Sequence, residues 1–228
     1  MKSELKKRIL TSLVLTFGTV FLIFIDPFIF KISLILIILI CYFEWSKFNT
    51  NYFKKKKKKN FSKYYLLNLL GLIYLIFVTF SAFNLRGDTF DDALFITFIL
   101  SICASSDIGG YVFGNFFGGR KLTKISPNKT VSGSFGSFVV SLIPIIFLNL
   151  FTNLNFIFDF NIKNIIFCLF ISLFCQIGDI FISYFKRLNK VKDTGTFLPG
   201  HGGFLDRVDG IIFAIPAAYV LKSLNFII

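Results

Sequence analysis

The sequence predicts an all-α protein that crosses a membrane about seven times and has its N-terminus in the cytosol. Of its 228 residues, 55% are hydrophobic and only 16% are charged, whereas about a quarter of the residues in a soluble domain are charged. Phe accounts for 34 residues, and a soluble fold of this size leaves too much of its chain at the surface to bury so many rings. We therefore expect one integral membrane domain over residues 1–228.

Seven apolar segments are candidates for spanning a hydrocarbon core, which takes roughly 17–25 helical residues. They are residues 9–25, 28–43, 64–83, 92–115, 135–151, 162–184 and 210–227. No small-x-small cleavage site follows the first segment, so we expect it to be a retained span. Asp26-Pro27 predicts a tight break after it. The fourth segment is expected to be irregular near its end, where glycines after Asp107 permit a broken or re-entrant backbone.

The basic residues fall in alternate connections between these segments. The N-terminal stretch and residues 44–63, 116–134 and 185–209 together hold 21 of the 25 Lys and Arg residues. Because Lys and Arg are retained on the cytosolic side of inserted helices, the N-terminus is predicted inside and the C-terminus outside. The net charge of +13 thus needs no nucleic acid to explain it. The lysine run 54–59 is either a solvated loop or an attraction to anionic lipid.

The first polar segment on the predicted cytosolic side runs from Ser105 to Ser134. It contains Asp107 and several glycines, which let backbone N–H groups approach phosphate oxygens. It is not a Walker A motif, because Gly-Lys-Ser/Thr is missing. Composition alone leaves a plain loop as an equal interpretation.

The second polar segment runs from Gln176 to Asp209. Asp179 lies inside the predicted end of the sixth span, where a carboxylate is costly and is a functional candidate by default. The alternative is a carboxylate neutralised by a nearby lysine. Helical spacing places one stripe of side chains on a single face: Gln176, Asp179, Ser183, Lys186 and Arg187. Such a stripe suits a cation at Asp179 and phosphate oxygens at the two basic residues.

A loop with four glycines and Pro199 follows this stripe. Asp206 and Asp209 stand three residues apart at the start of the seventh span. Acids there either stabilise a helix N-terminus or supply the hard oxygen ligands that Mg²⁺ shares with phosphate. His201, the only histidine, is either a structural loop residue or a general base. Together these features predict a Mg²⁺ and phosphate site at the cytosolic membrane surface.

From Ser183 to Asp209 the sequence resembles the signature of phosphatidate cytidylyltransferases, also called CDP-diacylglycerol synthases. Two upstream elements, residues 107–111 and 126–133, are similar to the family's Asp-x-x-Ala-Tyr and Ser-Pro-Lys-Lys-Thr-Trp-Glu-Gly. In the second element Asn128 replaces a lysine and Val131-Ser132 replace Trp-Glu. The specific resemblance covers about residues 100–210.

The resemblance implies that phosphatidate attacks the α-phosphorus of CTP, giving CDP-diacylglycerol and pyrophosphate for phospholipid synthesis. It implies a multi-pass protein of the bacterial cytoplasmic (inner) membrane with a cytosolic active site. Asp179 and Asp206 are the expected Mg²⁺ ligands; a second cation and a homodimer are left open. The expected catalytic residues are Asp179, Asp206, Asp209, Lys186 and Arg187. The expected substrate-binding residues are Asp107, Lys129, Ser183, Lys192, Asp193, His201, Gly202, Gly203 and Arg207.

Three alternatives remain open from the sequence. Two are enzymes: a related CTP-dependent lipid kinase and a cytidylyltransferase for another lipid. The third is a transporter that uses Asp107 and Asp179 as an ion path. A transport path needs polar residues through the full membrane depth, whereas these cluster near one face, which disfavours transport.

Overall fold

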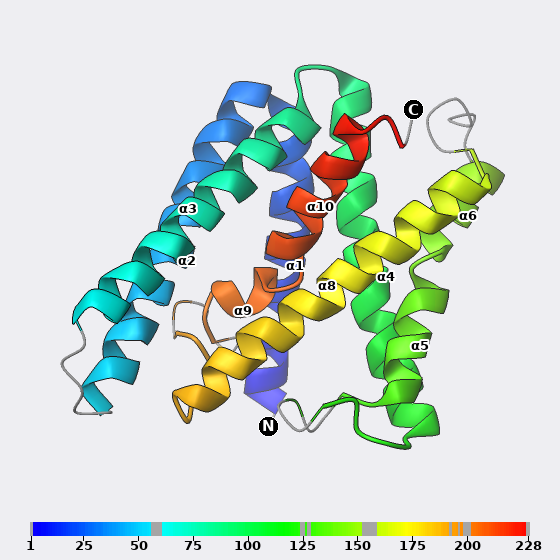
Figure 1. Ribbon diagram of the computed structural model, residues 1–228. Coiled ribbons are helices and arrows are strands. Elements are labelled where there is room, and N and C mark those ends of the chain that lie inside the picture. The colour runs from blue at the N-terminus through cyan, green and yellow to red at the C-terminus, as the bar shows by residue number, and fades with distance from the viewer. Residues whose placement is uncertain are drawn as a thin grey trace. The chain divides into compact units, whose positions relative to one another are not determined.

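The computed structural model describes residues 2–55, 61–123, 126, 129–151, 159–191, 193–195, 197 and 202–226. Over these residues the secondary structure is helical, with an isolated antiparallel β-bridge between Lys121 and Thr130. Each of the seven predicted apolar segments contains a helix where it is described (Figure 1). The predicted all-α class is therefore confirmed.

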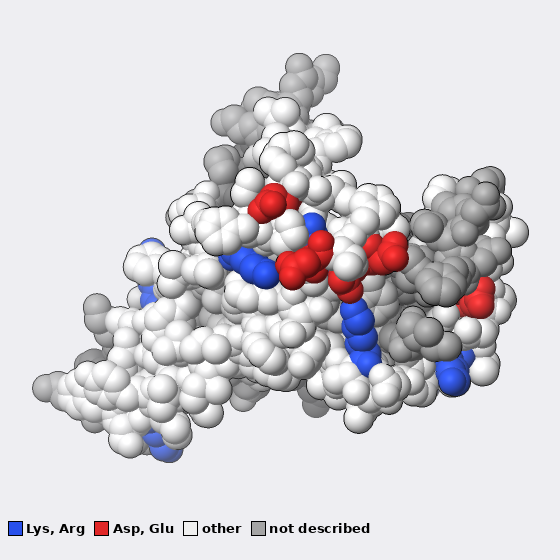
Figure 2. Space-filling model, turned by 90° about the horizontal axis from the view of Figure 1, so that it is seen from above, with Lys and Arg blue, Asp and Glu red and all other residues white. Residues whose placement is uncertain are grey.

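Five helices are long and apolar enough to cross a membrane. They are Pro27–Phe53, Phe61–Arg86, Phe90–Phe117, Val131–Leu150 and Ile162–Leu188. Two shorter apolar helices, Leu10–Ile25 and Ile211–Ser223, coincide with the first and last predicted segments. Large apolar side chains lie on the outside, as at Phe17, which is 70% exposed. On the face shown in Figure 2, most of the surface carries no charge. The chain is thus a multi-pass membrane protein, because an exterior this apolar belongs in lipid.

Contacts divide the chain into two units. The first consists of Met1–Ala93 and Phe185–Val208, and the second of Leu94–Tyr184 and Asp209–Ile228. Both long helices α4 (Phe90–Phe117) and α8 (Ile162–Leu188) cross a boundary, so each unit contains a part of them. The single domain expected over residues 1–228 stays a prediction.

The first unit is built on α1 (Lys2–Ile25), α2 (Pro27–Lys55) and α3 (Phe61–Arg86), with the short helix α9 (Leu205–Val208). Helices α2 and α3 lie side by side (Figure 1). Two side chains of α2 fix this pairing. Trp45 Nε1 donates to the Leu67 carbonyl at 3.2 Å, and Asn49 Nδ2 donates to Asn68 Oδ1 at 3.0 Å.

The predicted break at Asp26-Pro27 is confirmed. Helix α1 ends at Ile25 and α2 begins at Pro27, where the missing N–H of proline costs nothing because a helix leaves its first N–H groups unpaired. Asp26 Oδ1 accepts from the N–H groups of Phe28 and Ile29 at 2.7 and 3.1 Å. The aspartate is therefore the side-chain cap of α2.

The second unit contains most of α4 and α8 together with α5 (Val131–Val140), α6 (Ile143–Phe151) and α10 (Ile211–Ser223). The expectation of a broken backbone after Asp107 is wrong, because α4 continues as a helix to Phe117. The glycines instead allow α5 to approach closely. A Cβ on Gly109 would lie 2.4 Å from the Gly136 carbonyl oxygen, and a Cβ on Gly136 would lie 2.3 Å from Phe113 Cβ.

The fifth predicted segment is interrupted in the structure. Helix α5 ends at Val140 and α6 begins at Ile143. Pro144 has no N–H, so it cannot donate to the carbonyl of Val140, and a continuous helix loses a hydrogen bond there. In the intervening turn the Leu142 N–H donates to the Val139 carbonyl at 3.3 Å.

Candidate functional site

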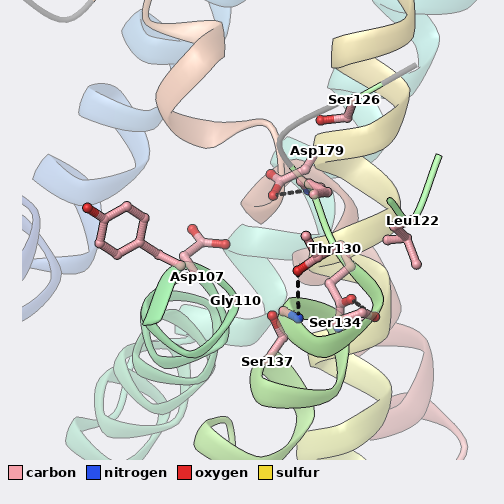
Figure 3. Close-up of a pocket in the computed structure, with 12 residues that line it drawn as sticks. Asp107, Gly110, Leu122, Ser126, Thr130, Ser134, Ser137 and Asp179 are labelled. Carbon is pink, nitrogen blue, oxygen red and sulfur yellow. Dashed lines mark hydrogen bonds and ion pairs between the residues drawn. The ribbon is translucent and has the colours of Figure 1, made fainter. Parts of the chain in front are cut away.

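A polar pocket of about 320 Å³ lies in the second unit (Figure 3). Its walls come from α4, from the loop between α4 and α5, and from α5 and α8. They combine two carboxylates and a lysine with five hydroxyl side chains and an amide. The lining residues are Asp107, Gly110, Tyr111, Leu122, Ser126, Lys129, Thr130, Gly133, Ser134, Ser137, Gln176 and Asp179. Both upstream elements found in the sequence therefore contribute to one cavity.

The loop between α4 and α5 delivers Lys129 to this pocket. Positive φ angles of 57° at Gly118 and 99° at Gly119 turn the chain after α4 in a region that favours glycine. The chain then doubles back, since the Leu122 N–H donates to the Lys129 carbonyl at 2.8 Å and the Val131 N–H donates to the Arg120 carbonyl at 3.0 Å. This narrow hairpin gives Lys129 a defined backbone position.

Lys129 forms an ion pair with Asp179 in the pocket. Its Nζ lies 2.6 Å from Asp179 Oδ2, and the two side chains are 28% and 20% exposed. Figure 3 shows Asp107 and Asp179 facing the same space, and Cys175 Sγ lies 3.8 Å from Asp107 Oδ1. Asp179 is therefore paired with a lysine, as one interpretation of the sequence expected. The lysine belongs to the upstream element at residues 126–133.

A series of hydrogen bonds between serine and glutamine side chains links α4, α5 and α8 beside the pocket. Ser134 Oγ donates to Gln176 Oε1 at 2.5 Å, and Gln176 Nε2 donates to Ser172 Oγ at 3.4 Å. Ser172 Oγ in turn lies 2.8 Å from Ser106 Oγ on α4, with neither serine exposed. The Ser137 hydroxyl completes the chain by donating to the Ser106 carbonyl at 2.8 Å. Linked bonds of this kind in a buried setting hold three helices in register.

In the second upstream element, Thr130 and Ser132 have a structural use, and of these Ser132 departs from the family pattern. Thr130 Oγ1 accepts from the Gly133 N–H at 3.1 Å and so caps α5. Ser132 Oγ donates to the Gly118 carbonyl, which ties the start of α5 to the turn after α4. Val131 is 52% exposed. Asn128 lies outside the described residues.

The backbone at Asp209 and Gly210 packs against α8 beside Asp179. A Cβ on Gly178 would lie 2.3 Å from the Asp209 carbonyl oxygen, and a Cβ on Gly210 would lie 3.2 Å from Asp179 Oδ1. The Asp209 side chain accepts from the Gly210 N–H at 3.0 Å. The Gly178 and Gly210 positions thus permit the chain before α10 to pack directly against α8.

In the first unit, Asp206 pairs with Lys186. Lys186 Nζ lies 2.9 Å from Asp206 Oδ1, and the side chains are 14% and 5% exposed. Asp206 Oδ2 accepts from the N–H groups of Thr194 and Gly203 at 2.7 and 3.1 Å. Both carboxylate oxygens therefore have protein donors, and a cation at Asp206 would share or replace the position of Lys186.

The other predicted residues of the signature loop are less enclosed. Arg187, Asp193 and Arg207 are exposed, while Ser183 is half-buried on α8. Gly203 is buried, and Gly202 has a φ of 84° beside Asp193. Lys192 and His201 lie outside the described residues.

The donor sets suit Mg²⁺ in part. Asp107 and Asp179 present carboxylate oxygens, which Mg²⁺ prefers, to one pocket. In the described part of the chain, no group of three or more His, Cys, Asp or Glu side chains is arranged to hold a metal. The expected ligands Asp179 and Asp206 belong to different units, and their sharing of one cation stays a prediction.

Glu44 on α2 is a buried carboxylate that is absent from the predicted site residues. Its side chain contacts the signature loop at three points, through the Thr194 hydroxyl and the N–H groups of Phe204 and Leu205. A sequence signal for it existed. Glu44 is the only acid between Pro27 and Phe53 and directly follows the predicted span 28–43. The helix in the structure extends past it to Phe53, and an acid in such a helix is costly unless it has a partner or a function.

Comparison with known proteins gives a consistent picture. Residues 50–224 match the cytidylyltransferase family. The chain is 41% identical over 133 residues to the phosphatidate cytidylyltransferase of Bacillus subtilis, covering 57% of this chain and 48% of that protein. It is 41% identical over 131 residues to that of Staphylococcus saprophyticus and 42% identical over 131 residues to that of Staphylococcus aureus. Each of the latter matches covers 56% of this chain and 48% of the relative. The chain thus spans about half the length of these curated relatives.

Proposed function

Because the chain belongs to the cytidylyltransferase family, we propose that it transfers CMP from CTP to phosphatidate, giving CDP-diacylglycerol and pyrophosphate for phospholipid synthesis. The observation that carries the proposal is the pocket of Asp107, Lys129 and Asp179, which lies within the matched residues. The names of the similar proteins supply the substrate class. The family resemblance expected from the sequence is confirmed.

The proposed reaction is an in-line phosphoryl substitution. A phosphate oxygen of phosphatidate forms a bond to the α-phosphorus of CTP, and the bond from that phosphorus to the bridging oxygen of the β-phosphate breaks. Pyrophosphate leaves with the electron pair of that bond. Catalysis of this kind depends mostly on positioning and on neutralising charge. The two substrates carry about five or six negative charges near neutral pH, so carboxylates alone would repel them.

We assign the charge neutralisation to named groups. Asp179 and Asp206 are the proposed Mg²⁺ ligands, and Asp107 and Asp209 are supporting candidates. When bound, Mg²⁺ would offset the negative charge of the phosphates. Lys129 and Lys186, each held in an ion pair, are proposed to bind substrate phosphate oxygens. Three further basic residues are proposed phosphate clamps: Arg187, Lys192 and Arg207. The active site is proposed to face the cytosol in a bacterial cytoplasmic membrane.

The test uses membranes that contain the full chain, supplied with phosphatidate, Mg²⁺ and CTP labelled at either the α- or the γ-phosphate. We expect α-label, but no γ-label, in a lipid that migrates as CDP-diacylglycerol. Asp179→Asn and Asp206→Asn should each lower the rate at least about 100-fold, since both remove a charge that the proposed transition state needs. Labelling is measured by thin-layer chromatography.

Asp159→Asn is the matched control. Asp159 is an exposed acid of the second unit outside the proposed site, so this variant should keep wild-type activity. Lipid labelled only by the γ-phosphate would replace the proposal with a lipid kinase. Absence of any labelled lipid, with the protein inserted at wild-type level, would reject nucleotide transfer to phosphatidate altogether.

A further inference from the structure

Glu44 has an environment unlike that of a surface acid. It lies on α2, outside the residues that match the family model, and is only 5% exposed. Its Oε1 accepts from the Phe204 N–H at 2.9 Å, while its Oε2 accepts from the Leu205 N–H at 2.9 Å and from the Thr194 hydroxyl at 3.2 Å. A buried carboxylate is stable when such donors replace its lost water.

Two carboxylates hold the same short stretch of loop. The Gly203 N–H donates to Asp206, and the N–H groups of Phe204 and Leu205 donate to Glu44. Thr194 is shared as well, because its N–H donates to Asp206 and its hydroxyl donates to Glu44. The position of Asp206 therefore depends on contacts that Glu44 makes with its immediate neighbours.

Glycine spacing in the loop fits this arrangement. A Cβ on Gly195 would lie 2.6 Å from Glu44 Oε1, and a Cβ on Gly203 would lie 2.6 Å from Glu44 Oε2. A side chain at either position would push the carboxylate away, since real Cβ atoms do not come so close to other atoms. Glu44 therefore accounts for the glycine at position 195, and Glu44 together with Thr194 accounts for the glycine at position 203.

Trp45, the residue after Glu44, contacts the residue that precedes Lys186. The Trp45 ring packs on the Phe185 ring with centroids 4.9 Å apart, and Phe185 directly precedes Lys186. The Trp45 ring is itself fixed by its hydrogen bond to the Leu67 carbonyl. Consecutive residues of α2 thus contact the Asp206 loop and the Lys186 segment of α8.

We propose that Glu44 is a positioning residue for the cytidylyltransferase reaction, acting through Asp206 and Lys186 and not on substrate. The inference rests on the proposed function. A carboxylate offers acceptors on both oxygens, whereas a glutamine of the same size offers one and turns an NH₂ group toward N–H donors. Glu44→Gln should therefore loosen the loop without changing the volume of the side chain.

The experiment compares the purified wild-type chain with three single variants of it: Glu44→Gln, Thr194→Val and Thr194→Ser. We expect Glu44→Gln to lower kcat about 10- to 100-fold, which is usual when a residue that orients a functional group is lost. The KM for CTP should stay within about twofold of wild type. Thr194→Val removes one donor and should lower kcat less. Thr194→Ser restores the hydroxyl and should recover most of that loss. Asp88→Asn, an exposed acid paired with Lys31 in the same unit, is the control and should leave kcat unchanged.

A second measurement does not depend on activity. Limited trypsin digestion followed by mass spectrometry reports the opening of the loop through cleavage after Arg187, Lys190 and Arg207. Glu44→Gln should speed these cleavages about tenfold and leave cleavage after Lys163 at the wild-type rate. If the wild type makes no CDP-diacylglycerol, the proposed function fails while this comparison still tests the anchoring of the loop.

Three outcomes would overturn the proposal. One is wild-type kcat together with wild-type cleavage in Glu44→Gln. Another is a raised KM for CTP at unchanged kcat, which would make Glu44 a binding residue. The third is faster cleavage at every site, including Lys163, which would make Glu44 a general stabiliser of the fold.

Discussion

Buried and half-buried carboxylates in this protein are held by donors that lie far away in the sequence. Lys129 reaches Asp179 over 50 positions, and Glu44 reaches Phe204 over 160. Removing one member of such a pair leaves the other without compensation in a medium that solvates charge poorly, and this is more damaging than removing both. The pairs are therefore testable as pairs.

At this scale we expect Lys129→Met to lower the free energy of unfolding by about 1–3 kcal/mol, because Asp179 then lacks its main donor. The double variant Lys129→Met/Asp179→Asn should cost less than the sum of the single variants by about 1 kcal/mol. Denaturation of the purified protein, followed by circular dichroism, measures both quantities. Lys121→Met, a change at an exposed lysine of the same loop, should stay within about 0.5 kcal/mol of wild type. Strict additivity of the Lys129 and Asp179 changes would contradict the pairing.

The site residues that could be predicted from sequence are those with a spacing or a motif. Asp179 was predicted from its depth in a span, Lys186 from the helical stripe that it shares with Asp179, and Asp206 from its place at the start of the seventh span and from the signature. Glu44 was missed because its partners are mostly backbone N–H groups, which leave no trace in residue type. The Lys129–Asp179 contact could not be predicted either, since the hairpin that delivers the lysine depends on the fold of the second unit.

At the scale of elements, glycines set how closely helices pack. Gly109 and Gly110 on α4 face Gly133 and Gly136 on α5, and a Cβ at any of these four positions would lie under 3.0 Å from a neighbouring atom. The sequence suggested a broken helix here because glycine is a poor helix former. The structure keeps α4 intact, since the gain from close packing between helices outweighs that local preference.

We therefore expect Gly136→Ala to destabilise the protein by about 1–3 kcal/mol, the usual range for forcing an extra carbon into a packed interface. Gly18→Ala is the matched control, because a Cβ at Gly18 has nothing within 4 Å. In the interior of α1 that change should be neutral or stabilising by up to about 1 kcal/mol. Thermal inactivation midpoints of the two variants, compared with wild type, measure the difference. Equal midpoints for both variants would show that the α4–α5 contact tolerates separation.

At the scale of the whole molecule, the distribution of basic residues predicts the orientation in the membrane. The connections predicted to be cytosolic hold 21 of 25 basic residues, and basic residues resist translocation. The span order agrees with this, since each of the seven predicted segments contains a helix where it is described. Which side each end occupies stays a prediction.

A reporter fused after Ile228 should lie outside the cytosol, whereas one inserted between Lys55 and Phe61 should be cytosolic. Alkaline phosphatase and green fluorescent protein fusions, which are active on opposite sides of the bacterial membrane, measure this. A cytosolic reporter at Ile228 would contradict an odd number of spans. An external reporter in the lysine-rich connection would reverse the whole orientation.

The local sequence alone determined the membrane-spanning helical class, the order of the spans and the family, because run length, charge placement and motif are properties of neighbouring residues. Tertiary structure alone decided three other matters. Gly109 packs against α5 and does not break α4. Lys129 neutralises Asp179. Glu44 and Asp206 together hold the signature loop. Each of these depends on which helix faces meet, and the rotation of one helix against another is not encoded in the spacing along a single segment.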